Sequence, residues 1–163
     1  MAILSHSGPV ALVLTRQKVP VIDRAKYAPA NGVRLGGYVL TDAPRGKPAI
    51  ILLASGSEVA LALGAHERLA AEGIAARVVS LPSMELFARQ PQEYRDAVLP
   101  PAVPARLAVE AAAPVPWYRW VGDHGAVLGI ERFGASAPYQ RIYEELGLTV
   151  ENVVRRAKEL LRA

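Results

Sequence analysis

The segment from Pro48 to Pro82 contains the clearest hydrophobic pattern in the chain. Residues 49–54 are an unbroken apolar run of strand length, which is typical of a strand buried on both faces. Apolar residues then recur at helical spacing over 59–70, and Gly73 stands where a helix often ends in a left-handed residue. A run rich in β-branched residues at 75–81 predicts the next strand. A strand, a helix and a strand in this order imply two parallel strands joined by a right-handed crossover, so we expect an α/β domain.

Ser55 and Glu58 stand between the first of these strands and the helix, with the spacing of a capping box. We expect the Ser55 hydroxyl to accept one free backbone N–H of the first turn, and the Glu58 carboxylate to accept another. His66 falls on the apolar stripe of the same helix. A hydrogen-bonded histidine in the core or at its rim is favoured there over a ligand.

Other segments complete the expected set of elements. Residues 34–41 have the pattern of a strand weakened by two glycines, and the turn-rich joint at 42–48 is short enough for an antiparallel hairpin. We therefore expect one antiparallel edge strand on an otherwise parallel sheet. The other predicted strands are 10–14, 105–109 and 126–130, and the other predicted helices are 84–88, 91–98, 138–147 and 149–161, with Thr149 as the N-cap of the last.

The composition indicates a globular protein without a membrane span. Of its 163 residues, 52% are hydrophobic and 21% are charged, which argues against disordered and fibrous classes. No apolar run approaches the roughly 20 residues that cross a bilayer, and the first ten residues lack the pattern of a signal peptide. The chain has no cysteine, which removes disulfides, thiol catalysis and cysteine-type zinc sites. We expect a cytoplasmic protein with no membrane contact.

The net charge of +4 comes from the first part of the chain. Residues 1–48 have a net charge of +5 and residues 49–163 a net charge of −1. The basic excess is spread along an arm that contains Pro and Gly, rather than clustered among aromatic residues, so we do not expect nucleic-acid binding. A small anionic ligand is favoured. Arg16 follows the predicted strand at 10–14, where its fork of donors suits a phosphate or carboxylate, although spacing alone favours a surface arginine.

The three histidines do not form a catalytic or metal site in the sequence pattern. His6 lies near the chain end, and His124 follows Asp123 between two glycines, which favours a turn over acid–base catalysis. Scattered histidines without cysteine do not predict a transition-metal site. The aromatic cluster at 117–120 is interpreted as packing or interface rather than as a platform for base stacking.

Eight short segments stand in a recognisable order along the chain. They are GPVALVLTRQ (8–17), GGYVL (36–40), ASGSEV (54–59), ARVVSLPS (76–83), VLP (98–100), VEA (109–111), FGASAP (133–138) and TVENV (149–153). In this set and order they resemble the C-terminal part of the transketolase family. Each segment alone is a weak signal, but together they cover nearly the whole chain from Gly8. The first and the seventh segments favour transketolase over the related dehydrogenase and deoxyxylulose-phosphate synthase families.

The resemblance implies a fold, a division of the chain and one binding residue. The fold is α/β, a three-layer sandwich with a mostly parallel five-stranded sheet and one antiparallel edge strand. Residues 1–22 are expected to be the final strand and tail of a preceding pyrimidine-binding domain, and residues 23–163 the transketolase C-terminal domain. Arg16, within the matched segment Thr15-Arg16-Gln17, is expected to bind the phosphate of the sugar substrate in the complete enzyme.

Complete enzymes of this family transfer a two-carbon ketol unit between sugar phosphates in the pentose phosphate pathway, with thiamine diphosphate and Mg²⁺. Gly122-Asp123 and Asn152 imitate part of the family's diphosphate and magnesium motif, but His124 takes its third position and no strand precedes Gly122, so we reject the match. The pyrimidine-activating glutamate and the proton-transferring histidines also have no counterpart. We therefore expect a terminal part of a transketolase that binds no cofactor, has no catalytic or metal-binding residue and does not transfer a ketol unit alone.

The resemblance also implies partners. They are the N-terminal and pyrimidine-binding domains of transketolase, in the same or a separate chain, and sugar phosphates. Because those domains would cover the first strand and the aromatic cluster, we expect the isolated chain to self-associate as a homo-oligomer. The alternative is a stand-alone, non-catalytic domain that dimerises or binds an anionic metabolite.

Overall fold

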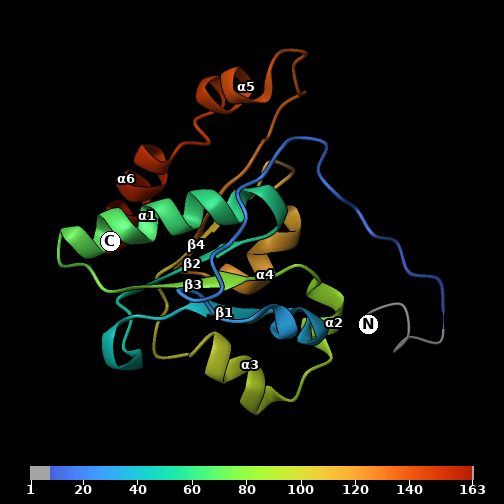
Figure 1. Ribbon diagram of the computed structural model, residues 1–163. Coiled ribbons are helices and arrows are strands. Elements are labelled where there is room, and N and C mark those ends of the chain that lie inside the picture. Colours follow the sequence, from blue (N-terminus) through green and yellow to red (C-terminus); the bar gives the residue numbers. More distant parts are fainter. Residues whose placement is uncertain (1–7, 163) are drawn as a thin grey trace.

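The computed structural model describes residues 8–162 and contains a sheet with the strand order β1-β3-β2-β4-β5. The strands are β1 (Tyr38–Thr41), β2 (Ile50–Ala54), β3 (Ala76–Ser80), β4 (Arg106–Val109) and β5 (Ala126–Leu128). The helices are α1 (Val59–Ala71), α2 (Met84–Ala88), α3 (Gln92–Val98), α4 (Tyr118–Val121), α5 (Tyr139–Glu145) and α6 (Val150–Leu160). Helices α1 and α6 lie side by side over one face of the sheet (Figure 1).

The centre of the fold is β2, in which all five residues are buried. It pairs in parallel with β3 on one side and with β4 on the other, so that Leu52 lies opposite both Val78 and Leu107. Alternate residues of β2 point to opposite faces. Leu52 and its even-numbered neighbours pack with α1 and α6, whereas Ile51 and Leu53 pack with Phe87, Trp117 and Trp120 from α2 and the α4 region.

Two separate cores on the two faces of one sheet make three layers. The predicted fold class is therefore confirmed, and so is the parallel crossover unit around β2. Trp117 and Trp120 are 2% and 7% exposed, which confirms a packing role for these two rings of the aromatic cluster, whereas Tyr118 is 52% exposed.

The antiparallel edge strand is confirmed, but the predicted hairpin between it and the following strand is wrong. β1 pairs with β3, in the register Tyr38 opposite Ser80, and not with β2. The physical reason is that both edges of β2 are already occupied. An ion pair between the buried Arg77 and the exposed Asp42 also ties the end of β1 to β3, because Arg77 Nε and Nη2 donate to the two carboxylate oxygens of Asp42 at 2.8 Å.

The predicted strand at 10–14 does not form. Residues 8–21 have no regular structure apart from bends, and Val13 and Leu14 are 94% and 81% exposed. A strand needs a partner for its backbone N–H and C=O groups, and no strand of residues 8–162 pairs with this segment. We call residues 8–22 the arm; it runs as an extended segment away from the sheet (Figure 1).

The predicted helix ends agree with the structure at two positions. Gly73 has φ +77° after the end of α1, and the Thr149 hydroxyl accepts the backbone N–H of Asn152 at the start of α6. Among residues 8–162, no helix combines the length and the apolar character needed to cross a membrane.

A pair of glycine substitutions tests the packing of α2 against the segment before β1. Gly36 and Gly73 both have a positive φ, so alanine is expected to cost about 1–2 kcal/mol at either position. A Cβ at Gly36 would also lie 2.3 Å from the Phe87 backbone nitrogen, whereas a Cβ at Gly73 would meet nothing within 4 Å. We expect Gly36→Ala to lower the free energy of unfolding by roughly 1–3 kcal/mol more than Gly73→Ala, measured by urea denaturation. Equal losses would contradict this packing.

Candidate functional site

The candidate site lies where β2 and β4 end. The chain leaves β2 toward β3 on one side, while β4 lies on the other side, so neighbouring connections diverge at these two carboxyl ends. In open α/β sheets, such a divergence creates the crevice in which ligands bind. Ser55 directly follows β2 and Glu110 directly follows β4.

Ser55 and Glu58 do not form the predicted capping box. The Ser55 hydroxyl donates to Glu110 Oε2 at 2.9 Å, and Glu58 Oε1 accepts from the hydroxyl of Tyr143 on α5. The chain between them makes a 3₁₀ turn, Gly56–Glu58, in which Ser55 has no side-chain cap bond. The two side chains therefore bond to distant elements instead of to the first turn of the helix.

The carboxyl groups of Glu58 and Glu110 are neighbours at this end of the sheet. Glu58 is 3% exposed, and Glu110 is half-buried. Burial raises the pKa of Glu110, and the neighbouring Glu58 raises it further, while hydrogen bonds from Ser55 and Trp117 oppose the shift. Glu110 consequently keeps its proton to a higher pH than an exposed glutamate does.

Tyr143 connects this acidic pair to the arm. Gln17 Nε2 donates to the Tyr143 hydroxyl at 3.1 Å, and the hydroxyl in turn donates to Glu58. Burial and the bond to Glu58 raise the pKa of Tyr143, so its hydroxyl remains protonated at neutral pH. Arg16, the predicted phosphate-binding residue, is exposed and immediately precedes Gln17. The structure thus brings the Arg16 segment next to the carboxyl ends of the strands.

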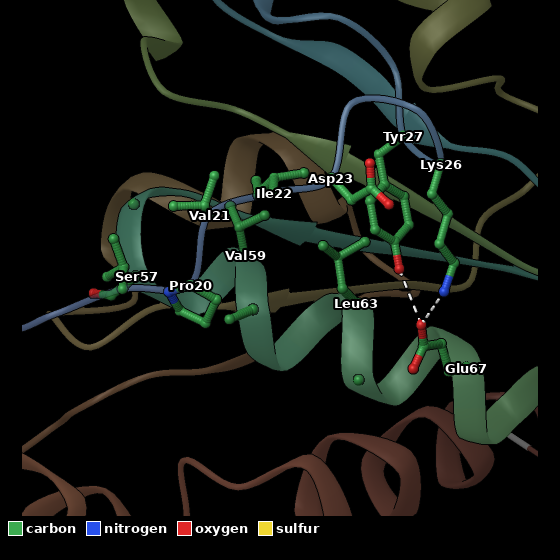
Figure 2. Close-up of a pocket in the computed structure, with 14 residues that line it drawn as sticks. Pro20, Val21, Ile22, Asp23, Lys26, Tyr27, Ser57, Val59, Leu63 and Glu67 are labelled. Atoms are coloured by element: carbon green, nitrogen blue, oxygen red, sulfur yellow. Dashed lines mark hydrogen bonds and ion pairs between the residues drawn. The ribbon is translucent and has the colours of Figure 1, made fainter.

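A cavity of about 470 Å³ lies between residues 19–27, which include the end of the arm, and α1. Figure 2 shows Val21 and Ile22 from the arm and Val59 and Leu63 from α1 among the residues that line it. At one end, the Tyr27 hydroxyl donates to Glu67 at 3.0 Å, and Lys26 forms an ion pair with the same carboxylate. The cavity is mainly apolar, so it suits packing of the arm on α1 better than binding of a charged ligand.

The histidines flagged in the sequence do not gather into a site. His66 on α1 is half-buried at the rim of the core, with a pKa lowered by burial. It forms a hydrogen bond with the backbone of Ala76, but its Nδ1 has no partner, so the expected hydrogen-bonded histidine is found only in part. Asp123 and His124 lie in an exposed turn between α4 and β5, as predicted. His6 lies outside the described residues.

The described residues also do not fit the diphosphate and magnesium motif. The Asn152 amide donates to the Gly147 carbonyl at 2.7 Å, and its oxygen accepts from Arg155, so both ends of this side chain are bonded locally. No group of three or more His, Asp or Glu side chains within residues 8–162 is placed to hold a metal ion.

The comparisons with known proteins agree on one family. A family model described as "Transketolase-like TK C-terminal domain" matches residues 36–149. The chain belongs to the transketolase family. It is similar to the transketolase of Geobacillus stearothermophilus, with 53% identity over 161 residues, which is 99% of this chain and 24% of that protein. It is also similar to transketolase 1 of Escherichia coli, with 52% identity over 156 residues, which is 96% of this chain and 23% of that protein.

A solved structure supports the same assignment. The crystal structure of the H261F mutant of transketolase from Pichia stipitis superimposes with a TM-score of 0.80 and 35% identity, covering 90% of this chain and 20% of that one. The chain thus spans about a quarter of the length of the curated transketolases that it matches. The resemblance read from the ordered segments is confirmed.

Sequence reasoning did not find Gln17, Tyr143 or Glu110 as members of a site. Glu110 had a usable signal, because it directly follows a predicted parallel strand. Tyr143 had none, since it is one tyrosine on a short helix, and its partners are 85 and 126 positions away in the sequence.

A substitution at Glu110 tests the electrostatics of the acidic pair. A carboxyl group with a raised pKa in the folded state contributes stability at low pH that is lost as the pH rises through that pKa. Glutamine imitates the protonated form, and its amide can donate to Glu58. We therefore expect Glu110→Gln to match the wild type near pH 4.5 and to be more stable at pH 8, as measured by urea denaturation.

The matched control for this prediction is Glu131→Gln. Glu131 is exposed in the loop after β5, so its stability difference from the wild type should not grow with pH. A Glu110→Gln variant that is less stable than the wild type at pH 8 would contradict the raised pKa.

Proposed function

We propose that this chain serves as the C-terminal part of a transketolase whose complete form transfers a two-carbon ketol unit between sugar phosphates. The observation that supports this most strongly is the identity of about one half to transketolases over nearly the whole chain. The absence of cysteine favours a cytoplasmic location for the enzyme.

We propose that the chain divides at the end of the arm. Residues 1–22 would complete a preceding pyrimidine-binding domain, and residues 23–163 would form the C-terminal domain. The exposed apolar side chains of the arm support this division, because Leu12, Val13 and Leu14 are 63–94% exposed and belong to neither hydrophobic core of the C-terminal domain. The remaining transketolase domains, or a second copy of this chain in a homo-oligomer, would cover them.

We propose that Arg16 binds the phosphate group of the sugar substrate. Its position supports this role, since it is exposed and forms no ion pair with a carboxylate among residues 8–162. An exposed guanidinium group without an ion-pair partner offers a planar fork of donors to a phosphate. The rest of the substrate site would come from the other domains.

Thiamine diphosphate and Mg²⁺ would be held by those other domains. The described residues offer no ligand set for them, because Asn152 is bonded locally and Asp123 lies in an exposed turn. Catalytic groups need to be held within about half an ångström of their productive positions, which a quarter of the enzyme cannot provide by itself. A non-catalytic domain that dimerises or binds an anionic metabolite is the second candidate, and the exposed apolar arm favours its dimerising form.

A ketol-transfer assay separates the two candidates. The purified chain, supplied with thiamine diphosphate, Mg²⁺, a ketose phosphate and an aldose phosphate, is expected to show no turnover. Addition of the missing transketolase domains as a separate polypeptide should restore it. The control is the same polypeptide without this chain. Turnover by the chain alone would refute the proposal, and failure to restore activity with a complex that does form would favour the non-catalytic domain.

Replacement of Arg16 tests the phosphate contact in the complete enzyme. We expect Arg16→Ala to raise KM for a phosphorylated ketose by at least about ten-fold, because a charge-assisted contact is lost, and to leave KM for an unphosphorylated ketose unchanged. Arg24→Ala removes the same charge from the same region, where the guanidinium only donates to the Ala28 carbonyl, and should change neither constant. An unchanged KM for Arg16→Ala would exclude Arg16 from the site.

A further inference from the structure

We propose that Tyr143 is a positioning residue, which holds the bend that carries Arg16 through its hydrogen bond to Gln17 and thereby sets the affinity for phosphorylated sugars. The inference rests on the phosphate-binding role proposed for Arg16. It assigns a role to a side chain of the C-terminal domain, on α5, that lies outside the catalytic groups.

The burial of the arm identifies Gln17 as its anchor. Ile22, the last residue of the arm, packs against the core, and among the arm residues before it, 8–21, only Gln17 is half-buried while the others are exposed. Its neighbour Arg16 lies at a bend, is exposed, and forms no side-chain hydrogen bond or ion pair within residues 8–162. The position of Arg16 relative to the domain therefore depends on what holds Gln17.

Gln17 is held by a hydrogen-bond chain with a defined direction. A carboxylate can only accept, so the Tyr143 hydroxyl donates its single proton to Glu58, and its oxygen is left to accept from Gln17 Nε2 at 3.1 Å. Ser57 Oγ lies 3.4 Å from the same hydroxyl oxygen. Glu58 is 3% exposed and fixed at the start of α1. This buried acceptor in the C-terminal domain therefore determines the direction of the hydrogen bonds from Gln17 through Tyr143.

Packing holds the ring of Tyr143 independently of its hydroxyl. The ring of Tyr139 meets it edge-on, with the centroids 5.6 Å apart. Both rings line a hollow of about 180 Å³ under Gln17 and Lys18. Removal of the hydroxyl oxygen should therefore leave α5 in place and break only the link to the arm.

A released arm would bind phosphate less well for an entropic reason. If Gln17 loses its partner, Arg16 must be ordered when the substrate binds, and that ordering opposes binding. The chemical groups of the reaction are not moved by this change, so KM should respond and kcat should not.

The first experiment compares Tyr143→Phe and Tyr139→Phe in the complete enzyme, with KM measured for a phosphorylated and an unphosphorylated ketose. For Tyr143→Phe we expect KM for the phosphorylated ketose to rise about three- to ten-fold, with kcat within about two-fold of the wild type and KM for the unphosphorylated ketose unchanged. Tyr139→Phe, a loss of the same group one helical turn away, should leave all these constants unchanged. Equal effects of the two substitutions would overturn the inference.

A second readout does not depend on activity. Hydrogen exchange of the peptide that covers residues 12–19, followed by mass spectrometry on the same complete enzyme, should be faster in Tyr143→Phe and unchanged in Tyr139→Phe. Gln17→Ala, which removes the other partner of the same hydrogen bond, should reproduce both effects of Tyr143→Phe. The double variant should be no worse than either single variant, because both remove one link.

These results distinguish the inference from the proposed role of Arg16. If Arg16→Ala raises KM but Tyr143→Phe changes neither KM nor exchange, the positioning role is wrong and the role of Arg16 stands. If hydrogen exchange increases in Tyr143→Phe but KM is unchanged in both Arg16→Ala and Tyr143→Phe, the hydrogen-bond link to the arm is real. In that case Arg16 does not bind the phosphate, and the functional part of the inference is wrong.

Discussion

The constraint on which the rest of the structure depends is the complete burial of β2. A strand with apolar side chains on both faces and paired strands on both edges leaves no side open to water. Each face must be covered by helices, which produces the three layers. Because both edges of β2 are paired, β1 pairs instead with the outer edge of β3. The parallel pairing of β2 with β4 also places the residues that follow these two strands side by side.

Polar groups that follow the carboxyl ends of β2 and β4 are buried or half-buried as a consequence. Glu58 lies under the arm and α5, and a buried carboxyl group is tolerated only when it is hydrogen-bonded. Its partner comes from α5, and the nearby Glu110 is bonded to Ser55. The cluster therefore adds a polar connection between the ends of two core strands, a peripheral helix and the arm, which already contact the same hydrophobic core through residues such as Leu52, Val109 and Ile22.

The exposed arm explains how such a domain fits into a larger enzyme. Its apolar residues have the composition of a buried strand but no partner strand within residues 8–162. The chain spans about a quarter of the transketolases that it matches. The hydrogen bond between Tyr143 and Gln17 connects this extended arm to the C-terminal domain.

The sequence by itself determined the elements whose causes are local. The apolar run of β2, the stripe of α1, the left-handed Gly73 and the cap at Thr149 each depend on residues a few positions apart, and all are present in the structure. The ordered segments also determined the family. The tertiary structure alone decided that residues 10–14 form no strand, that β1 adjoins β3, and that Ser55 and Glu58 bond to Glu110 and Tyr143 instead of capping their own helix. These outcomes depend on partners tens of residues away. The local spacing of residues does not determine which distant group is brought within hydrogen-bonding distance of a buried donor or acceptor.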